Sequence, residues 1–112
     1  MLVVNRFDVP EGGEETFLQQ GEAALTALSA RPGFLRGRLT RAMDEPGRWC
    51  LVSEWESVGS YRRALSNFDV KMYGTPLLAA ALPEASAFEV RLEATPGELR
   101  AFEGDLAPGG AA

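Results

Sequence analysis

Residues 34–56 read FLRGRLTRAMDEPGRWCLVSEWE, and this stretch decides the fold of the chain. Side chains alternate along both halves of it, as they do in strands that bury one face. Between the halves lies Asp44-Glu45-Pro46-Gly47, a composition typical of a reverse turn. The stretch therefore predicts a β-hairpin, and the alternation places Phe34 on the same face as Arg36.

The sequence before this hairpin predicts a strand and a helix. Residues 1–9 alternate, with Val3, Asn5 and Phe7 on one face, and Pro10 ends the strand. Small and apolar residues then recur at helical spacing until Pro32-Gly33 stops the helix. They are Phe17, Gly21, Ala24, Leu25 and Leu28.

The sequence after the hairpin predicts a second helical region and a last strand. Ser57 is suited to cap the N-terminus of a helix. Asn67 and Asp69 interrupt the helical pattern, which then continues over 70–82. Residues 87–93 alternate again and predict a strand.

The order strand, helix, strand, strand, helix, strand is that of a split βαβ domain. We therefore expect an α+β, ferredoxin-like fold with one four-stranded antiparallel sheet, spanning residues 1–94. From Thr95 the composition shifts toward Pro and Gly. We expect residues 95–112 to be a tail, partly disordered or packed on a partner subunit.

In such a fold the helices cover one face of the sheet only. Two apolar rows, Leu35/Leu39 and Cys50/Val52, are expected to lie bare on the other face. Burying large apolar side chains contributes about 1.5–3 kcal/mol each, so the bare face favours sheet-to-sheet dimerisation. We expect a homodimer that forms a dimeric α/β barrel.

Composition excludes several classes of chemistry. The chain has no histidine and a single cysteine, Cys50, which rules out Ser-His-Asp catalysis, imidazole metal ligands and an intrachain disulfide. The net charge of −5 disfavours binding to nucleic acid. No apolar run approaches the ~20 residues of a membrane-spanning helix. We expect a cytoplasmic protein that binds neither nucleic acid nor membranes.

An ordered set of short motifs resembles one family over Met1 to Glu93. The motifs are Asn5-Arg6-Phe7, Phe17, Pro32-Gly33-Phe34, Glu54-Trp55-Glu56-Ser57 and Tyr61. Together they resemble the antibiotic biosynthesis monooxygenase superfamily of small dimeric α/β-barrel proteins. That family includes cofactor-independent oxygenases that convert polyketide anthrones to quinones, haem-degrading oxygenases, and members without known activity.

The resemblance implies a cofactor-independent monooxygenase that oxidises an aromatic or polyketide-like substrate, such as an anthrone or quinol, with dioxygen and without metal or flavin. Asn5, Trp55 and Tyr61 would be its catalytic residues. An Asn amide can hold an oxygen-derived anion, and a Trp offers a flat apolar surface and an indole N–H. The residues expected to contact the substrate are Arg38, Phe7, Met72 and Tyr73.

Each of these residues also has a purely structural interpretation. Asn5 can bridge strands, Trp55 can pack helix against sheet, Tyr61 can keep its hydroxyl in water, and Arg38 can be solvated. The alternative function is therefore a non-catalytic dimeric binding or stress-response module of the same fold. A haem-binding or haem-degrading role is disfavoured, because that branch of the family uses an axial histidine. The two leading functions differ in whether Asn5, Trp55 and a tyrosine hydroxyl converge on one cavity.

Overall fold

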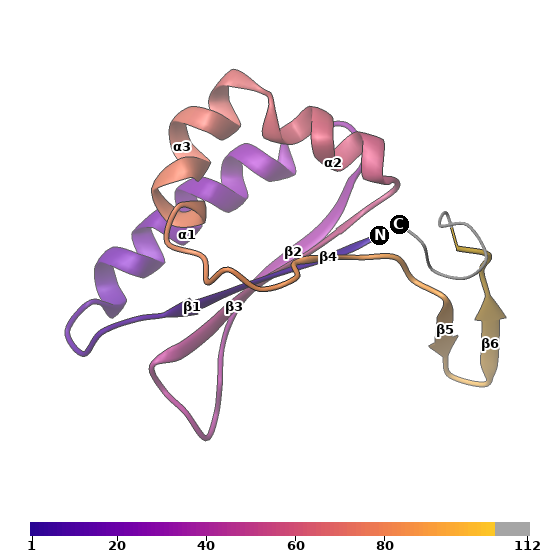
Figure 1. Ribbon diagram of the computed structural model, residues 1–112, viewed down its shortest axis with the longest axis horizontal. Helices are drawn as coiled ribbons and strands as arrows, with labels where there is room; N and C mark the ends of the chain where they lie inside the picture. The colour runs from indigo at the N-terminus through magenta and orange to yellow at the C-terminus, as the bar shows by residue number, and fades with distance from the viewer. Residues whose placement is uncertain (105–112) are drawn as a thin grey trace.

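The computed structural model describes residues 1–104, in which a four-stranded antiparallel sheet carries three helices on one side (Figure 1). The sheet has the strand order β2-β3-β1-β4, the arrangement that a split βαβ unit produces. The α+β, ferredoxin-like fold is thus confirmed. Its elements are β1 (Leu2–Asp8), α1 (Glu14–Ser29), β2 (Phe34–Arg41), β3 (Arg48–Trp55), α2 (Val58–Leu65), α3 (Phe68–Leu78) and β4 (Ala87–Phe88).

Side-chain caps explain where the second helical region breaks. The Ser57 hydroxyl accepts a hydrogen bond from the Ser60 N–H at 3.0 Å, and this begins α2. The Asn67 side chain accepts from the N–H groups of Asp69 and Val70, at 3.0 and 3.2 Å, and this begins α3. The interruption expected at Asn67 is therefore the start of a separate helix. Of the helices in the described region, none is long and apolar enough to cross a membrane.

The hydrophobic core lies between the sheet and the helices. Strand β3 sets it, because Trp49, Leu51, Ser53 and Trp55 alternate inward along the strand and are all buried. The opposite residues of β1 and the inner faces of α1 and α3 complete it. The other buried apolar residues are Val3, Phe7, Phe17, Ala24, Ala27, Leu28, Ala64, Val70 and Leu77.

The first strand of the hairpin departs from the expected alternation. Phe34 pairs with Trp55, but the next paired residue is Arg36, opposite Glu54, so that Leu35 forms a bulge. Phe34 and Arg36 therefore lie on opposite faces, and the expectation that they share one was wrong. The bulge also turns Leu39 toward the helices, opposite Leu51. Leu39 is therefore part of the core and not of a bare outer row.

The C-terminal segment also differs from expectation. The predicted strand over 87–93 is wrong beyond Phe88, because β4 has only two residues. A separate hairpin follows, formed by β5 (Leu92–Thr95) and β6 (Glu98–Ala101), which projects away from the sheet (Figure 1). All residues of these two strands are exposed. The predicted division after residue 94 falls inside β5, and residues 105–112 of the predicted tail lie outside the described region.

Candidate functional site

The sheet separates the predicted site residues into two groups. Asn5 is paired with Leu51 and lies on the helix side, as does Trp55. Arg38 is paired with Val52 and lies on the open side, because neighbouring residues of a strand point to opposite faces. The side chains of Asn5 and Arg38 therefore project from opposite faces of one subunit.

Trp55 forms the centre of an aromatic cluster at one end of the helix side. Its ring lies 5.2 Å from that of Phe34, edge to face, and 5.5 Å from that of Tyr61. The side chain is fully buried, and its indole N–H donates to the Ser53 hydroxyl at 2.9 Å. Because this N–H is already engaged within the protein, Trp55 contributes shape and apolar surface.

The Ser53 hydroxyl accepts a hydrogen bond from Trp55, whereas the Asn5 side chain makes no hydrogen bond within residues 1–104. The Asn5 side chain is partly buried. It lies opposite Leu51, four residues before Trp55 along β3, or about 13 Å at the usual rise of a strand. Asn5 therefore offers a free donor on the helix side of the sheet.

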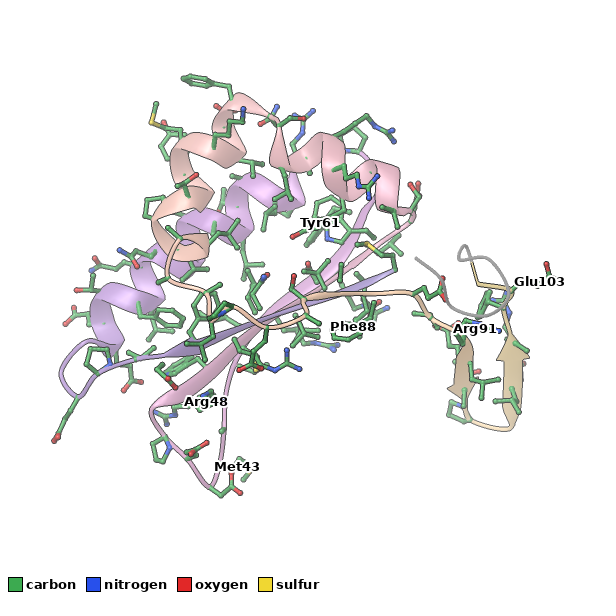
Figure 2. The ribbon with its side chains drawn as sticks, viewed as in Figure 1. Met43, Arg48, Tyr61, Phe88, Arg91 and Glu103 are labelled. Carbon is green, nitrogen blue, oxygen red and sulfur yellow. The ribbon has the colours of Figure 1, made fainter. Side chains whose placement is uncertain are left out.

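Tyr61 projects from α2 toward the sheet (Figure 2). It is partly buried against Trp55, and burial raises the pKa of its hydroxyl above the ordinary value of 10.0. Within the described residues this hydroxyl has no hydrogen-bond partner. At neutral pH Tyr61 is therefore a neutral phenol, able to donate a proton or a hydrogen bond.

The other predicted contact residues line three separate hollows. Phe7 is buried against Phe17, at 5.1 Å between ring centres, and borders a hollow of about 390 Å³. Met72 borders an apolar hollow of about 510 Å³ on α3. Tyr73 borders a groove of about 700 Å³ between α1 and α3. These three side chains do not line a common cavity.

Trp55 borders a fourth hollow, of about 600 Å³, where the end of the sheet meets the base of the β5–β6 hairpin. Its apolar wall includes Leu35 and Phe102. Its rim is acidic, with the carboxylates of Glu54, Glu56, Glu89, Glu93 and Glu103. In the described part of the chain, no group of acidic or sulfur side chains has the geometry of a metal site.

The open face of the sheet carries an apolar strip. The strip is formed by the paired residues Val4 and Val52, with Leu2 and Cys50 beside them. Phe88, paired with Leu2, extends it on the side away from the helices (Figure 2). All of these side chains keep part of their surface exposed.

One polar group was missed by sequence reasoning. The Nε of Arg31 is buried and has no hydrogen-bond partner among residues 1–104. Arg31 follows the end of α1 and borders the groove that Tyr73 also lines. The sequence does contain a pattern that could have indicated this groove. Arg31 follows a helical row of alanines, Ala23, Ala27 and Ala30, whose side chains are too small to fill the space between two helices.

The sequence pattern that defines the antibiotic biosynthesis monooxygenase family matches residues 1–73. This match covers well over half of the chain. The chain belongs to the antibiotic biosynthesis monooxygenase family.

Individual proteins resemble this chain in sequence or in fold. A 42.8 kDa protein in the whiE locus of Streptomyces coelicolor is 34% identical over 59 residues, which are 53% of this chain and only 15% of that protein. Among solved structures, SnoaB, a cofactor-independent oxygenase from Streptomyces nogalater, superimposes with a TM-score of 0.64 at 23% identity. That likeness covers 96% of this chain and 94% of SnoaB. A conserved protein from Methanosarcina mazei gives a TM-score of 0.63 at 17% identity, covering 77% and 84% of the two chains.

The antibiotic biosynthesis monooxygenase match includes Asn5, Trp55 and Tyr61 and ends at Tyr73. The β5–β6 hairpin lies beyond it. At these levels of identity the solved structures establish the fold only. The match with SnoaB covers 96% of this chain and so includes the hairpin region.

Proposed function

We propose that this chain is a cofactor-independent monooxygenase that oxidises an aromatic or polyketide-like substrate, of the anthrone or quinol type, with dioxygen. Family membership supports the reaction class. The observation that carries the proposal is a pair of neutral groups on the helix side that have no hydrogen-bond partner within residues 1–104. They are the Tyr61 hydroxyl, whose ring lies against Trp55, and the Asn5 amide, farther along the same face of the sheet. Neutral donors in a partly desolvated site suit a substrate that becomes an anion.

In this mechanism the substrate supplies the electrons. An anthrone CH₂ group loses one proton to water, and the resulting carbanion reduces dioxygen and forms a C–O bond to a peroxide anion. The Asn5 N–H donates to this anion, and the Tyr61 hydroxyl protonates it. The hydroperoxide then loses water, so that CH₂ and O₂ become C=O and H₂O. Tyr61 regains its proton from solvent.

Removal of the Asn5 donor tests the proposal. Oxygen uptake is measured with 1,8-dihydroxyanthrone for the wild type, Asn5→Ala, Asn5→Asp and Tyr61→Phe. Asn5→Asp keeps the shape of the side chain but replaces its donor with a negative acceptor, and we expect it to lose activity as Asn5→Ala does. Loss of one such donor lowers kcat about 10²- to 10³-fold. Uptake no faster than in buffer, or equal uptake by wild type and Asn5→Ala, would contradict the mechanism.

A second function is supported by a different observation. The Trp55 indole N–H is engaged by Ser53, and the predicted contact residues line separate hollows. These features suit a non-catalytic binding module of the same fold. Such a module would bind the anthrone without consuming oxygen, and a shift of the haem Soret band on titration would point to haem binding instead.

We also propose that a second copy of the chain covers the open face. The apolar strip there lies beside Arg38, which makes no ion pair within residues 1–104. The projecting hairpin exposes Leu92 and Leu99, and an isolated two-stranded hairpin is at best marginally stable in water. Packing of both the strip and the hairpin on a partner removes this apolar surface from water.

A further inference from the structure

Strand β2 leaves one edge of the sheet open to a further strand. Its backbone pairs with β3 on one side, and along residues 36–41 no backbone hydrogen bond reaches any other part of the described chain. The opposite edge is closed, because β4 pairs with β1 and the Val4 N–H donates to the Ser86 carbonyl at 2.7 Å. The β2 edge therefore offers a row of free donors and acceptors.

The side chains of β2 restrict which strand can pair with this edge. The charged residues of β2 are Arg36, Arg38 and Arg41, and none is acidic. Arg36 and Arg41 form ion pairs with Glu54 and Glu14, whereas Arg38 has no ion pair in the described part of the chain. Like charges oppose the pairing of β2 with another copy of β2. The edge therefore favours an acidic strand.

The β5–β6 hairpin is a two-stranded ribbon with two different faces. Its ladder places four apolar residues on one face. They are Leu92, Ala94, Leu99 and Ala101. The side chains of Leu92 and Leu99 are 66% and 71% exposed. On the polar face Glu98 lies opposite Thr95, so it has no cation across the ribbon. The ribbon thus carries an uncovered apolar face and, on the other side, an acidic residue.

The hairpin lies far from the β2 edge of its own chain. It follows β4, and β4 and β2 are the two opposite edges of the sheet. Two strands lie between them, which separates the edges by about 15 Å. Figure 1 shows the hairpin projecting away from the sheet. A ribbon that pairs with β2 therefore comes from a second copy of the chain.

Both faces of the ribbon have a complement at the β2 edge. On the helix side, Leu25 and Leu39 are partly buried, and Leu25 lies against Gly37 of β2. On the open side lies Arg38. A strand added beside β2 continues both faces of the sheet, so one orientation of the ribbon brings Glu98 to Arg38. The same orientation brings the apolar face of the ribbon to Leu25 and Leu39.

We propose that the β5–β6 hairpin of one copy pairs through β6 with the β2 edge of the other, with Glu98 beside the partner's Arg38. This inference rests on the second copy proposed above, and a two-fold axis repeats the contact so that both hairpins dock. Val90 and Phe102, at the base of the hairpin, line the hollow beside Trp55. Docking on the partner therefore holds the outer wall of that hollow in place.

Hydrogen–deuterium exchange of the full chain, read by mass spectrometry at a low and a high protein concentration, tests the contact directly. We expect amide exchange in residues 36–41 and 92–101 to slow about tenfold at the high concentration, because the pairing protects these amides. The amides of α1 should exchange equally at both concentrations. Unchanged exchange in 36–41 or 92–101, in a chain that does associate, would overturn the docking of the hairpin on β2.

An exchange of charges tests the proposed ion pair. Arg38→Glu and Glu98→Arg each bring like charges together, and we expect each to weaken association about tenfold in sedimentation velocity. The double variant should recover association to within about threefold of the wild type. Matched controls are Arg62→Glu and Glu11→Arg, the same changes at exposed positions away from the contact, and they should associate as the wild type does. Circular dichroism verifies folding, and if a single variant does not fold, the hydrogen exchange of the wild type decides.

The outcomes separate this contact from the proposed dimer and from the proposed reaction. A wild-type chain that stays monomeric would overturn both the dimer and the hairpin contact. Association that Val52→Lys weakens, but that neither Arg38→Glu nor Glu98→Arg changes, would leave the dimer standing and overturn the hairpin contact. A double variant that does not recover would overturn the ion pair. None of these measurements uses oxygen uptake, so each is independent of the oxygenase activity.

Discussion

Replacement of Ser53 by alanine probes the polar groups buried under the helices. Ser53 and Trp55 are 2% and 0% exposed, and the indole N–H donates to the Ser53 hydroxyl at 2.9 Å. Ser53→Ala leaves this N–H buried and without its acceptor. An unsatisfied buried donor destabilises a protein by about 1–3 kcal/mol, so we expect the free energy of unfolding to fall by about 2 kcal/mol.

Asn5 lies on the same side of the sheet as Ser53, but its replacement by alanine should have little effect on stability. Its amide makes no hydrogen bond within the described residues, so Asn5→Ala removes no internal interaction. We expect the stability of Asn5→Ala to remain within about 0.5 kcal/mol of the wild type. An amide that contributes nothing to folding but is needed for turnover is the signature of a functional group.

Urea denaturation at one fixed protein concentration measures both variants, followed by tryptophan fluorescence and far-UV circular dichroism. Ser29→Ala is the control, because it removes an exposed hydroxyl that bonds to the carbonyl of Thr26. If Ser53→Ala unfolds at the same urea midpoint as Ser29→Ala, the buried bond does not stabilise the fold as argued. A loss of 2 kcal/mol or more in Asn5→Ala would show that Asn5 is structural.

Two further predictions concern the open face and Tyr61. Val52→Lys places a charge on the apolar strip, and we expect it to weaken self-association at least tenfold, as measured by sedimentation velocity. The control Leu18→Lys, on the helix side, should sediment as the wild type does. A wild-type chain that stays monomeric at high concentration would contradict the proposed dimer. Because burial raises the pKa of Tyr61 above 10.0 in the folded state, the unfolded state loses this proton first, and the free energy of unfolding should fall as pH rises past about 10. Urea titrations from pH 8 to 11 measure this fall, and Tyr61→Phe should make it shallower; an equal slope in the variant would mean that Tyr61 is not desolvated.

Most of the secondary structure could be predicted because its signals are local. Ser57 caps a helix with its own hydroxyl, and Asn67 starts the next helix in the same way. The alternation along β3 was sufficient to identify its inward face, since every second residue from Trp49 to Trp55 is buried. Such signals act over a few residues and need no knowledge of the rest of the chain.

The bulge at Leu35 had no such signal. Alternation assumes an unbroken ladder, and one extra residue opposite Trp55 and Glu54 reverses the face of every residue before it relative to those after it. The same holds for the β5–β6 hairpin, whose eight exposed residues carry no alternation toward a core. Sequence reasoning therefore assigned Leu39 to the wrong face and continued the last strand too far.

For the candidate site, too, some features could be predicted from the sequence and others could not. The sequence identified Asn5, Trp55 and Tyr61 as residues of interest, from their type and from a resemblance that the family match bears out. It did not reveal that the Trp55 N–H is engaged by Ser53, that Arg38 lies across the sheet from Asn5, or that the Arg31 Nε–H lacks a partner. The first joins residues only two apart, but like the other two it depends on how side chains are oriented and packed in the folded chain.

The chain by itself determined the strands and helices from residue 1 to Ser57 and their order, because turn, cap and periodicity signals are written in neighbouring residues. That order restricted the fold to a sheet with helices on one side. Apart from the helix caps, only the tertiary structure decided which polar side chains found partners, because such a hydrogen bond needs a separation of about 3 Å that depends on how the side chains pack. The groups without partners in the described residues, on which the proposed function rests, could therefore be identified only from the tertiary structure.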